Sequence, residues 1–319
     1  MKKQKHIIVT GGAGFIGAHL VERLLADGKS VVVIDDLSTG SRDNLRAVSM
    51  NKNFRFIQSK ISSCTELPDL AADAEFIFHL AATVGVELVV KSALHVLEAS
   101  FNEMQSLLRA AGQNSTPLLF TSTSEVYGKS AKPEFSEDDD LLIGPPGHSR
   151  WSYASAKLTD EFLALAYARE KGLPVTVARL FNTVGPRQTG RYGMVLPRFI
   201  AAAKKNEPLK VFGDGAQSRC FCFVHDAIES LIRLQQCEKA RGEIFNIGGT
   251  EEVSILDLAK LVVTTLGSQS SIELIPYDQA YAPGFDDMRR RKPLVEKLDR
   301  FVKFKPQTTL REIIRLTAQ

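Results

Sequence analysis

Tyr153 and Lys157 are four positions apart at the start of a helical pattern, so their side chains would share one helix face. An ammonium group beside a phenol favours the phenolate, which predicts that the pKa of Tyr153 is lowered towards neutrality. A tyrosine in that state can take a proton from an alcohol that is being oxidised. Taken alone, this spacing is common in purely structural helices, so the neighbouring motifs decide its meaning.

The run Thr121–Gly128, TSTSEVYG, supplies more polar groups just after a predicted strand. In open α/β sheets the carboxyl ends of the strands face the ligand crevice. We therefore expect Thr123 to hydrogen-bond the reacting hydroxyl, with Ser124 and Glu125 following it into the crevice. For Glu125 the alternative is a solvated carboxylate at the end of the strand.

A glycine-rich turn, Thr10–Gly17 (TGGAGFIG), lies between an apolar strand and a helical pattern. Gly12, Gly14 and Gly17 fit the dinucleotide fingerprint GxGxxG, and Gly11 begins the related GxxGxxG pattern. Side chains here would keep a pyrophosphate away from the backbone amides, and the helix amino terminus adds partial positive charge. The turn therefore predicts a dinucleotide site.

Asp35 stands 18 residues after Gly17, at the end of the next apolar strand. A carboxylate at this position would bind the ribose hydroxyls of the adenosine and repel a 2′-phosphate. We therefore predict NAD rather than NADP as the cofactor. In a chain with such a turn, Tyr153 and Lys157 are interpreted as catalytic rather than structural.

These groups need a scaffold, and the first 180 residues alternate short apolar runs with amphipathic ones. Helical patterns cover Phe15–Ala26 and Ala156–Lys171, and a further helix is expected around Ala99–Ala111. This alternation predicts an α/β fold with a Rossmann-type, doubly wound parallel sheet. The candidate strands are His6–Thr10, Val31–Ile34, Phe54–Ile57, Phe76–His79, Leu118–Thr121 and Val175–Leu180.

Beyond residue 180 the pattern loosens, and Asn182–Gly193 is typical of a loop. We expect residues 1–180 to form the NAD-binding domain with the catalytic Thr, Tyr and Lys. Residues 181–319 would form a smaller, mostly helical lobe that binds the substrate, with some chain crossing back to the sheet. The acidic run Glu137–Asp140 is predicted to be a solvated loop. Helical patterns in the lobe lie near Val195–Lys205, Val224–Leu234 and Ile255–Leu266.

The 319 residues are 44% hydrophobic and 24% charged, with a net charge of +3. This charge is too small to indicate nucleic-acid or membrane binding. No apolar run approaches the ~20 residues that a membrane helix needs, and the opening Met1–His6 is not typical of a signal peptide. The four cysteines form no CxxC pair, so we predict no metal site and reduced thiols in a cytoplasmic protein.

Together these motifs resemble the extended short-chain dehydrogenases/reductases that act on sugar nucleotides. The resemblance covers nearly the whole chain, and it implies a nucleotide-linked sugar, UDP-linked in the enzymes most alike, as substrate. It also implies a homodimer in which the helix beginning at Tyr153 and the helix at Ala99–Ala111 form a four-helix bundle. The motifs that carry it further are HLAA at His79–Ala82, FNTVGPRQ at Phe181–Gln188, FGDGAQSRCF at Phe212–Phe221 and FNIGG at Phe245–Gly249.

The same resemblance assigns contacts beyond those derived above. Asn182, Arg219 and the Arg289–Arg291 cluster would hold the diphosphate, because a guanidinium fork suits phosphate geometry. The further cofactor contacts that it implies are Phe15, Ile16, Asp36, Ser38, Thr39, Gly40, Ile61, Leu80, Ala81, Ala82, Asn102 and Thr121. The further substrate contacts are Val84, Ser124, Val195, Leu196, Val211, Phe212 and Arg291.

A narrower similarity is to the UDP-glucuronate decarboxylases, including those of the aminoarabinose pathway, and to the UDP-apiose/xylose synthases. It rests on LLIGPPGHSRWSYASAK at Leu141–Lys157, SRCF at Ser218–Phe221 and PGFDDMRRRKP at Pro283–Pro293. Three features depart from the pattern. Lys60 stands near the usual position of an Asp that contacts adenine, FNTVGPRQ is more like an epimerase motif, and Leu294 stands where an Asp is common.

The chemistry that these enzymes share is a transient oxidation of the sugar at C4, with Tyr153 as base, Thr123 as its partner and Lys157 keeping Tyr153 ionised. We favour decarboxylation of UDP-glucuronate, because C4 oxidation makes a β-keto acid and Glu125 and Arg219 could orient the carboxylate or handle the following proton. A nucleotide-sugar 4-epimerase is the main alternative. A 4,6-dehydratase and a non-catalytic NAD-binding regulator are further alternatives, and the intact Thr123, Tyr153 and Lys157 argue against the last.

Overall fold

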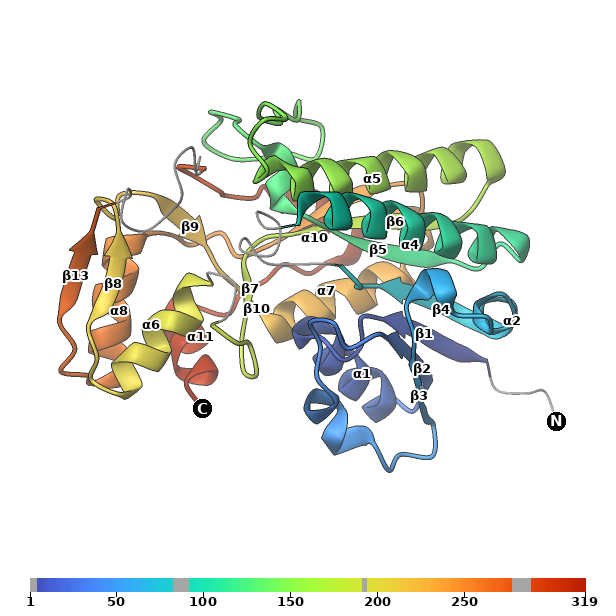
Figure 1. The fold of residues 1–319 in the computed structure, drawn as a ribbon, viewed down its shortest axis with the longest axis horizontal. Helices are drawn as coiled ribbons and strands as arrows, with labels where there is room; N and C mark the ends of the chain where they lie inside the picture. The colour runs from blue at the N-terminus through green and yellow to red at the C-terminus, as the bar shows by residue number, and fades with distance from the viewer. Residues whose placement is uncertain (1–4, 83–91, 191–193, 277–287) are drawn as a thin grey trace.

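The centre of the structure, a computed structural model that describes residues 5–82, 92–190, 194–276 and 288–319, is a seven-stranded sheet (Figure 1). Every strand pairing in it is parallel, in the order β11-β6-β5-β4-β1-β2-β3. The strands are β1 (His6–Thr10), β2 (Ser30–Asp35), β3 (Phe54–Gln58), β4 (Ala74–His79), β5 (Leu118–Thr123), β6 (Val175–Leu180) and β11 (Ile244–Ile247).

Both faces of this sheet are buried. Ile7 and Val9 of β1 belong to the apolar cluster beneath α1 (Phe15–Ala26) and α7 (Val224–Gln236), whereas Ile8 belongs to the opposite cluster. The helices on that second face are α2 (Leu67–Asp73), α4 (Ala93–Gln113) and α5 (Trp151–Lys171). Successive strand residues point to opposite faces, which explains why the strands are almost continuously apolar. Each such buried side chain contributes about 1.5–3 kcal/mol.

Helices α4 and α5 lie side by side along one face of the sheet, where Figure 1 shows them as the green pair. Ser100 of α4, which is partly buried, donates a 2.6 Å hydrogen bond to the buried Asp160 of α5. The two helices therefore form one layer that carries Tyr153 and Lys157 above the strand ends.

A smaller lobe lies beside the sheet (Figure 1, left). Its helices are α6 (Val195–Lys204), α8 (Ile255–Leu266) and α11 (Leu310–Thr317). Two small sheets accompany them: β8 (Leu209–Phe212) with β13 (Ile272–Ile275), and β9 (Ser218–Cys220) with β12 (Glu252–Ser254). A third pairs β7 (Thr183–Val184) with β10 (Cys222–Phe223). The short helix α10 (Glu296–Val302) follows near the end of the chain.

The structure confirms the predicted doubly wound sheet and shows how the chain crosses back to it. Helix α7 and strand β11, both beyond residue 180, pack against the sheet, and β11 is a seventh strand that the sequence patterns did not predict. The boundary at residue 180 itself stays a prediction. Near the site, β5 runs on through Thr123 and α5 begins at Trp151, earlier than the predicted Ala156.

The prediction of a solvated acidic loop at residues 137–140 was wrong for its first residue. Glu137 is buried, and its carboxylate accepts a 2.8 Å hydrogen bond from the backbone N–H of Asn246. The acceptor is needed because this part of β11 lies at the edge of the sheet, where its amides have no further strand to pair with. No described helix is long and apolar enough to span a bilayer.

Gly11 and Gly17, in the glycine turn between β1 and α1, have no room for a side chain. A Cβ on Gly17 would lie 2.7 Å from the Cα of Gly12, and one on Gly11 would lie 2.6 Å from the backbone nitrogen of Ala81. Gly11 also has a φ of +69°. These approaches let β1, α1 and the end of β4 meet closely around the turn.

We predict that Gly17→Ala destabilises the protein although it places alanine in a helix. Replacing glycine by alanine within a helix usually stabilises it by about 1 kcal/mol. Here the clash of the added Cβ with rigid backbone destabilises the folded state by about 1–3 kcal/mol. Denaturant unfolding measures the net loss. Gly147→Ala is the matched control, because nothing lies within 4 Å of its Cβ. A Gly17→Ala variant as stable as the control would contradict this packing.

Candidate active site

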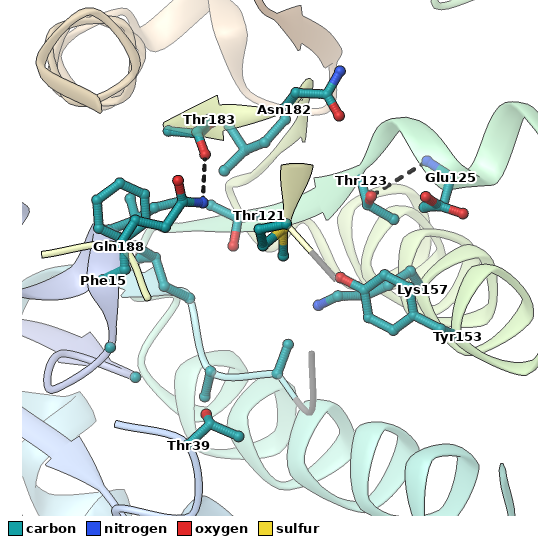
Figure 2. Close-up of a pocket in the computed structure, with 18 of the residues that line it drawn as sticks. Phe15, Thr39, Thr121, Thr123, Glu125, Tyr153, Lys157, Asn182, Thr183 and Gln188 are labelled. Atoms are coloured by element: carbon teal, nitrogen blue, oxygen red, sulfur yellow. Dashed lines mark hydrogen bonds between the residues drawn. The ribbon is translucent and has the colours of Figure 1, made fainter. Parts of the chain in front are cut away.

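A cavity of about 510 Å³ opens at the carboxyl ends of the strands, between the sheet and the smaller lobe. Figure 2 shows Tyr153 and Lys157 entering it from α5, with Thr123 and Glu125 beside them and Phe15 and Thr39 at the other end. The cavity therefore brings the glycine turn together with two motifs that follow it by more than 100 residues in the sequence.

One end of the cavity is built by the glycine turn and Asp35. Gly11, Gly14 and Gly17 line it, and no side chain of the described residues caps the amino terminus of α1. Its first amides are thus open to a phosphate. The Asp35 carboxylate accepts hydrogen bonds from the backbone N–H of Ala13 at 2.9 Å and of Leu37 at 2.8 Å. Burial raises the pKa of Asp35 although these two bonds oppose it.

These observations fit NAD. The first amides of α1 carry no side-chain cap from the described residues and are open to a pyrophosphate, and Asp35 keeps lone pairs for ribose hydroxyls beside its two backbone bonds. Most of the predicted cofactor contacts also line this part of the cavity. They are Phe15, Ile16, Asp36, Ser38, Thr39, Ile61, Leu80, Ala81, Ala82 and Thr121.

Two predicted cofactor contacts do not line the cavity. Asn102 is exposed on α4, and its carbonyl accepts a 2.8 Å hydrogen bond from Ser106. The next residue, Glu103, faces the cavity instead, because one step along a helix turns the side chain by about 100°. Gly40 instead packs closely against the backbone of the glycine turn, because a Cβ on Gly40 would lie 2.9 Å from the carbonyl carbon of Ala13.

The catalytic set predicted from the sequence comes together at the middle of the cavity. Thr123 ends β5, its Oγ1 accepts a 3.2 Å hydrogen bond from the Glu125 N–H, and it also hydrogen-bonds Tyr153. The Lys157 ammonium lies 4.4 Å from the centroid of the Phe120 ring. The arrangement presents a threonine hydroxyl and a phenol to the same point, as oxidation of an alcohol requires.

The pKa of Tyr153 departs from its ordinary value in the direction opposite to the prediction. Burial raises it, and the negative charge of Glu125 raises it further, while the Thr123 hydrogen bond lowers it. Burial also lowers the pKa of Lys157, against the carboxylates of Asp160, Glu161 and Glu103. The error arose because the sequence pairs Tyr153 with Lys157 but does not show how deeply the phenol is enclosed.

Glu125 is held by a cluster of three arginines. Arg291 donates to its Oε1 at 2.5 Å, and Arg150 approaches its Oε2 at 3.1 Å. Burial raises the pKa of Glu125, but the charges of Arg291, Arg150 and Arg219 outweigh burial and hold it below its ordinary value. Three cations around one carboxylate leave positive charge for a second anion.

Only some of the predicted substrate contacts line the cavity. Ser124, Asn182, Val195, Phe212, Arg219 and Arg291 line the cavity. Leu196 and Val211 do not, because their side chains are fully buried in the apolar core of the lobe. Of the arginine cluster, Arg289 and Arg290 are exposed, and Arg290 pairs with Glu252 at 2.6 Å. Val84 lies outside the described residues.

Sequence reasoning missed several charged residues that line the cavity, Arg198 and Lys210 among them, and two of the others bear on its chemistry. Arg150 lies three positions before Tyr153, at the amino terminus of α5, so helical spacing could have revealed it. Glu103 is the other, and burial together with Asp36 raises its pKa to about 7, while Lys60 and Lys157 lower it. No sequence pattern distinguished Glu103 from its exposed neighbours on α4.

The parallel sheet, its dinucleotide turn and the Thr123–Tyr153 pair define an NAD-dependent enzyme. The chain belongs to the NAD dependent epimerase/dehydratase family, whose model matches residues 7–248. It is 39% identical to the UDP-N-acetyl-alpha-D-glucosaminuronate decarboxylase of Bacillus cytotoxicus, over 99% of this chain and 97% of the relative. It is 34% identical to UDP-glucuronic acid decarboxylase 2 of Arabidopsis thaliana, over 98% of this chain and 67% of that protein.

The fold is similar to that of the UDP-glucuronic acid 4-epimerase from Bacillus cereus, solved in complex with UDP-glucuronic acid and NAD. The TM-score is 0.87 with 29% identity, and the match covers 98% of each chain.

We predict that the purified protein carries NAD(H), since a cofactor that is regenerated within each turnover need not leave. The charge of Asp35 disfavours a 2′-phosphate. Denaturing the protein and identifying the released nucleotide by mass spectrometry measures this. NADP(H) as the main species would contradict the role assigned to Asp35.

Proposed function

We propose that the protein decarboxylates a UDP-linked glucuronic acid after transient oxidation of the sugar at C4. The observation that carries this proposal is the arginine cluster around Glu125, directly beside the Thr123–Tyr153 pair. An enzyme that handles a carboxylate next to the oxidised carbon needs cations at this position. Both decarboxylases named above act on UDP-linked uronic acids by their names, with and without a 2-acetamido group.

Each catalytic residue has a separate role in the reaction. Tyr153 takes the proton of the C4 hydroxyl and Thr123 hydrogen-bonds the same oxygen. Because burial and Glu125 raise the pKa of Tyr153, the positive charge of Lys157 is needed to stabilise the phenolate as it forms. When bound, NAD supplies the two-electron acceptor for C4. The resulting C4 ketone is β to the carboxylate at C5, so it can accept the electron pair that is released as the bond to CO2 breaks. One proton must then be added at C5, and Tyr153 returns its own proton to the C4 oxygen on reduction.

The arginines orient the carboxylate before it leaves. Arg150 and Arg291 already bind a carboxylate in this structure, that of Glu125, and Arg219 acts on the same group. The sugar carboxylate would share these arginines, so they would stabilise the ionised form of Glu125 less. The pKa of Glu125 would then rise. Glu125 can then deliver the proton at C5 or orient the water that does.

A 4-epimerase is the second candidate, favoured by the fold similarity to the UDP-glucuronic acid 4-epimerase. Epimerisation uses the same oxidation and re-reduction and needs no group that acts on the carboxylate. The two functions therefore differ in what Glu125 must do.

We predict that Glu125→Gln slows CO2 release from UDP-glucuronate by about 10²–10⁴-fold, the usual effect of losing an acid–base group. C4 oxidation should persist in part, because Thr123 and Tyr153 are retained. Tyr153→Phe is the control, and it should suppress both steps. Stopped-flow absorbance of NADH beside a CO2 assay separates the two.

The assay uses UDP-glucuronate and its 2-acetamido analogue in parallel. An unchanged CO2 rate in Glu125→Gln would remove Glu125 from the mechanism. Absence of CO2 from the wild type on both sugars would contradict the decarboxylase proposal itself.

We also propose a homodimer, in the cytoplasm, where the free thiols of all four cysteines stay reduced. The α4–α5 layer bears large apolar side chains on its outer side. Leu94, Leu97 and Phe101 recur at helical spacing on α4 with exposures of 69%, 40% and 41%, and Phe162 of α5 is 64% exposed. Two such layers would cover one another as a four-helix bundle.

We predict that Phe162→Glu shifts the protein from dimer to monomer in light scattering at micromolar concentration. The reason is the loss of about 1.5–3 kcal/mol per buried large side chain, in both subunits, and the burial of charge. Met50→Glu is the control, since Met50 is 95% exposed and lies away from both helices. A wild-type monomer at this concentration would contradict the proposal.

A further inference from the structure

A buried carboxylate behind the cavity joins the elements that carry the catalytic groups. Glu161 lies on α5, four positions after Lys157 and eight after Tyr153, so all three are on similar sides of the helix. Glu161 and its partner Arg179 of β6 are each 2% exposed, and neither lines the cavity. The mechanism above makes no use of them.

The Glu161 carboxylate binds two neighbouring strands at once. Ser122 of β5 donates to its Oε1 at 2.5 Å, and Ser122 directly precedes Thr123. Arg179 donates from Nε to the same oxygen at 3.0 Å and from Nη2 to Oε2 at 2.7 Å. In the sheet Ser122 and Arg179 are paired residues of β5 and β6. The carboxylate therefore meets a matched set of donors fixed by strand register.

Arg179 extends the connection to the segment of Glu125. Its Nη1 donates to the hydroxyl of Tyr127 at 3.0 Å, two residues after Glu125. The Tyr127 hydroxyl in turn donates to Asn246 of β11 at 2.7 Å. One ion pair thus connects the helix of Tyr153, the strand of Thr123 and the turn of Glu125.

Apart from the Thr123–Tyr153 hydrogen bond and the Lys157 ammonium over the Phe120 ring, the described packing of α5 on the sheet is mainly apolar, and apolar contacts are non-directional. A two-point guanidinium–carboxylate interaction has defined geometry. We propose that Glu161 is a positioning residue, which fixes the rotation and height of α5 so that Tyr153 meets Thr123 and Lys157 stays at the cavity. This inference rests on the C4 oxidation of the proposed function, but not on the loss of CO2.

Glu161 also acts on Lys157 through its charge. The titratable groups that influence Lys157 are Asp160 and Glu161 on α5, Glu103 on α4 and His79 on β4. Burial lowers the pKa of Lys157, and the Glu161 carboxylate raises it. Removing that negative charge therefore lowers the pKa of Lys157 further. Because Lys157 acts in its protonated form, the alkaline limb of the rate profile should move to lower pH.

The test is Glu161→Gln, with C4 oxidation followed as NADH absorbance across a range of pH. We expect oxidation to slow by about 10–10²-fold, since small misplacements of reacting groups have effects of this size. KM should change little, and the alkaline limb should shift to lower pH. Hydrogen exchange of residues 151–157 should accelerate selectively, which reports the position of α5 without activity.

Glu161→Asp is the second variant, because it keeps the charge but withdraws the carboxylate. It should slow oxidation while leaving the alkaline limb in place, and it carries the test if Glu161→Gln does not fold. Glu137→Gln is the matched control, a buried carboxylate that accepts a hydrogen bond from the Asn246 amide, is also acted on by the charge of Arg179, and is not among the charges that raise the pKa of Lys157. It should lower stability without moving the pH profile.

Wild-type oxidation rates in both Glu161 variants would overturn the inference, as would the same pH shift in Glu137→Gln. NADH formation without CO2 in the wild type would refute decarboxylation alone. Wild type that oxidises no UDP-sugar would overturn both proposals.

Discussion

A parallel sheet that is covered by helices on both faces has only its strand ends available for polar chemistry. Ile7, Ile8 and Val9 show the constraint, because consecutive residues of β1 are buried in opposite apolar clusters. Polar groups therefore gather where the strands stop: Thr10 and His79 hydrogen-bond each other at 2.7 Å, and Asp35 and Thr123 end their own strands at the cavity. The cofactor turn, the catalytic pair and the arginine cluster all depend on this edge.

At that edge the balance of charge divides the cavity into regions with different tasks. One end presents the carboxylates of Asp35 and Asp36, with Glu103 and Lys60 beside them, as suits ribose hydroxyls and a nucleotide without a 2′-phosphate. The end with Arg150, Arg219 and Arg291 is basic around Glu125. Tyr153 stands between them, with its pKa raised by burial and by Glu125. A substrate carboxylate that shares the arginines with Glu125 would therefore change the pKa of Glu125 and, through the charge of Glu125, that of Tyr153.

Much of this could be predicted from sequence because the signals are local. The glycine turn, Asp35 and the Tyr153–Lys157 spacing each lie within one strand–turn–helix unit, and all line the cavity. The misses depend on three-dimensional packing. Leu196 and Val211 lie next to cavity residues in the sequence but point into the core, and Asn102 is one helical step from Glu103. The raised pKa of Tyr153 and the burial of Glu137 follow from enclosure by segments distant in sequence, which no local pattern records.

The central claim is that the basic end of the cavity exists to act on a carboxylate next to the oxidised carbon. The most direct measurement is mass spectrometry of the nucleotide sugar after incubation of the wild-type protein with UDP-glucuronate and with its 2-acetamido analogue. The account predicts a product lighter by CO2 from at least one of them. An isomer of unchanged mass from both, with no CO2 released, would contradict it and identify an epimerase.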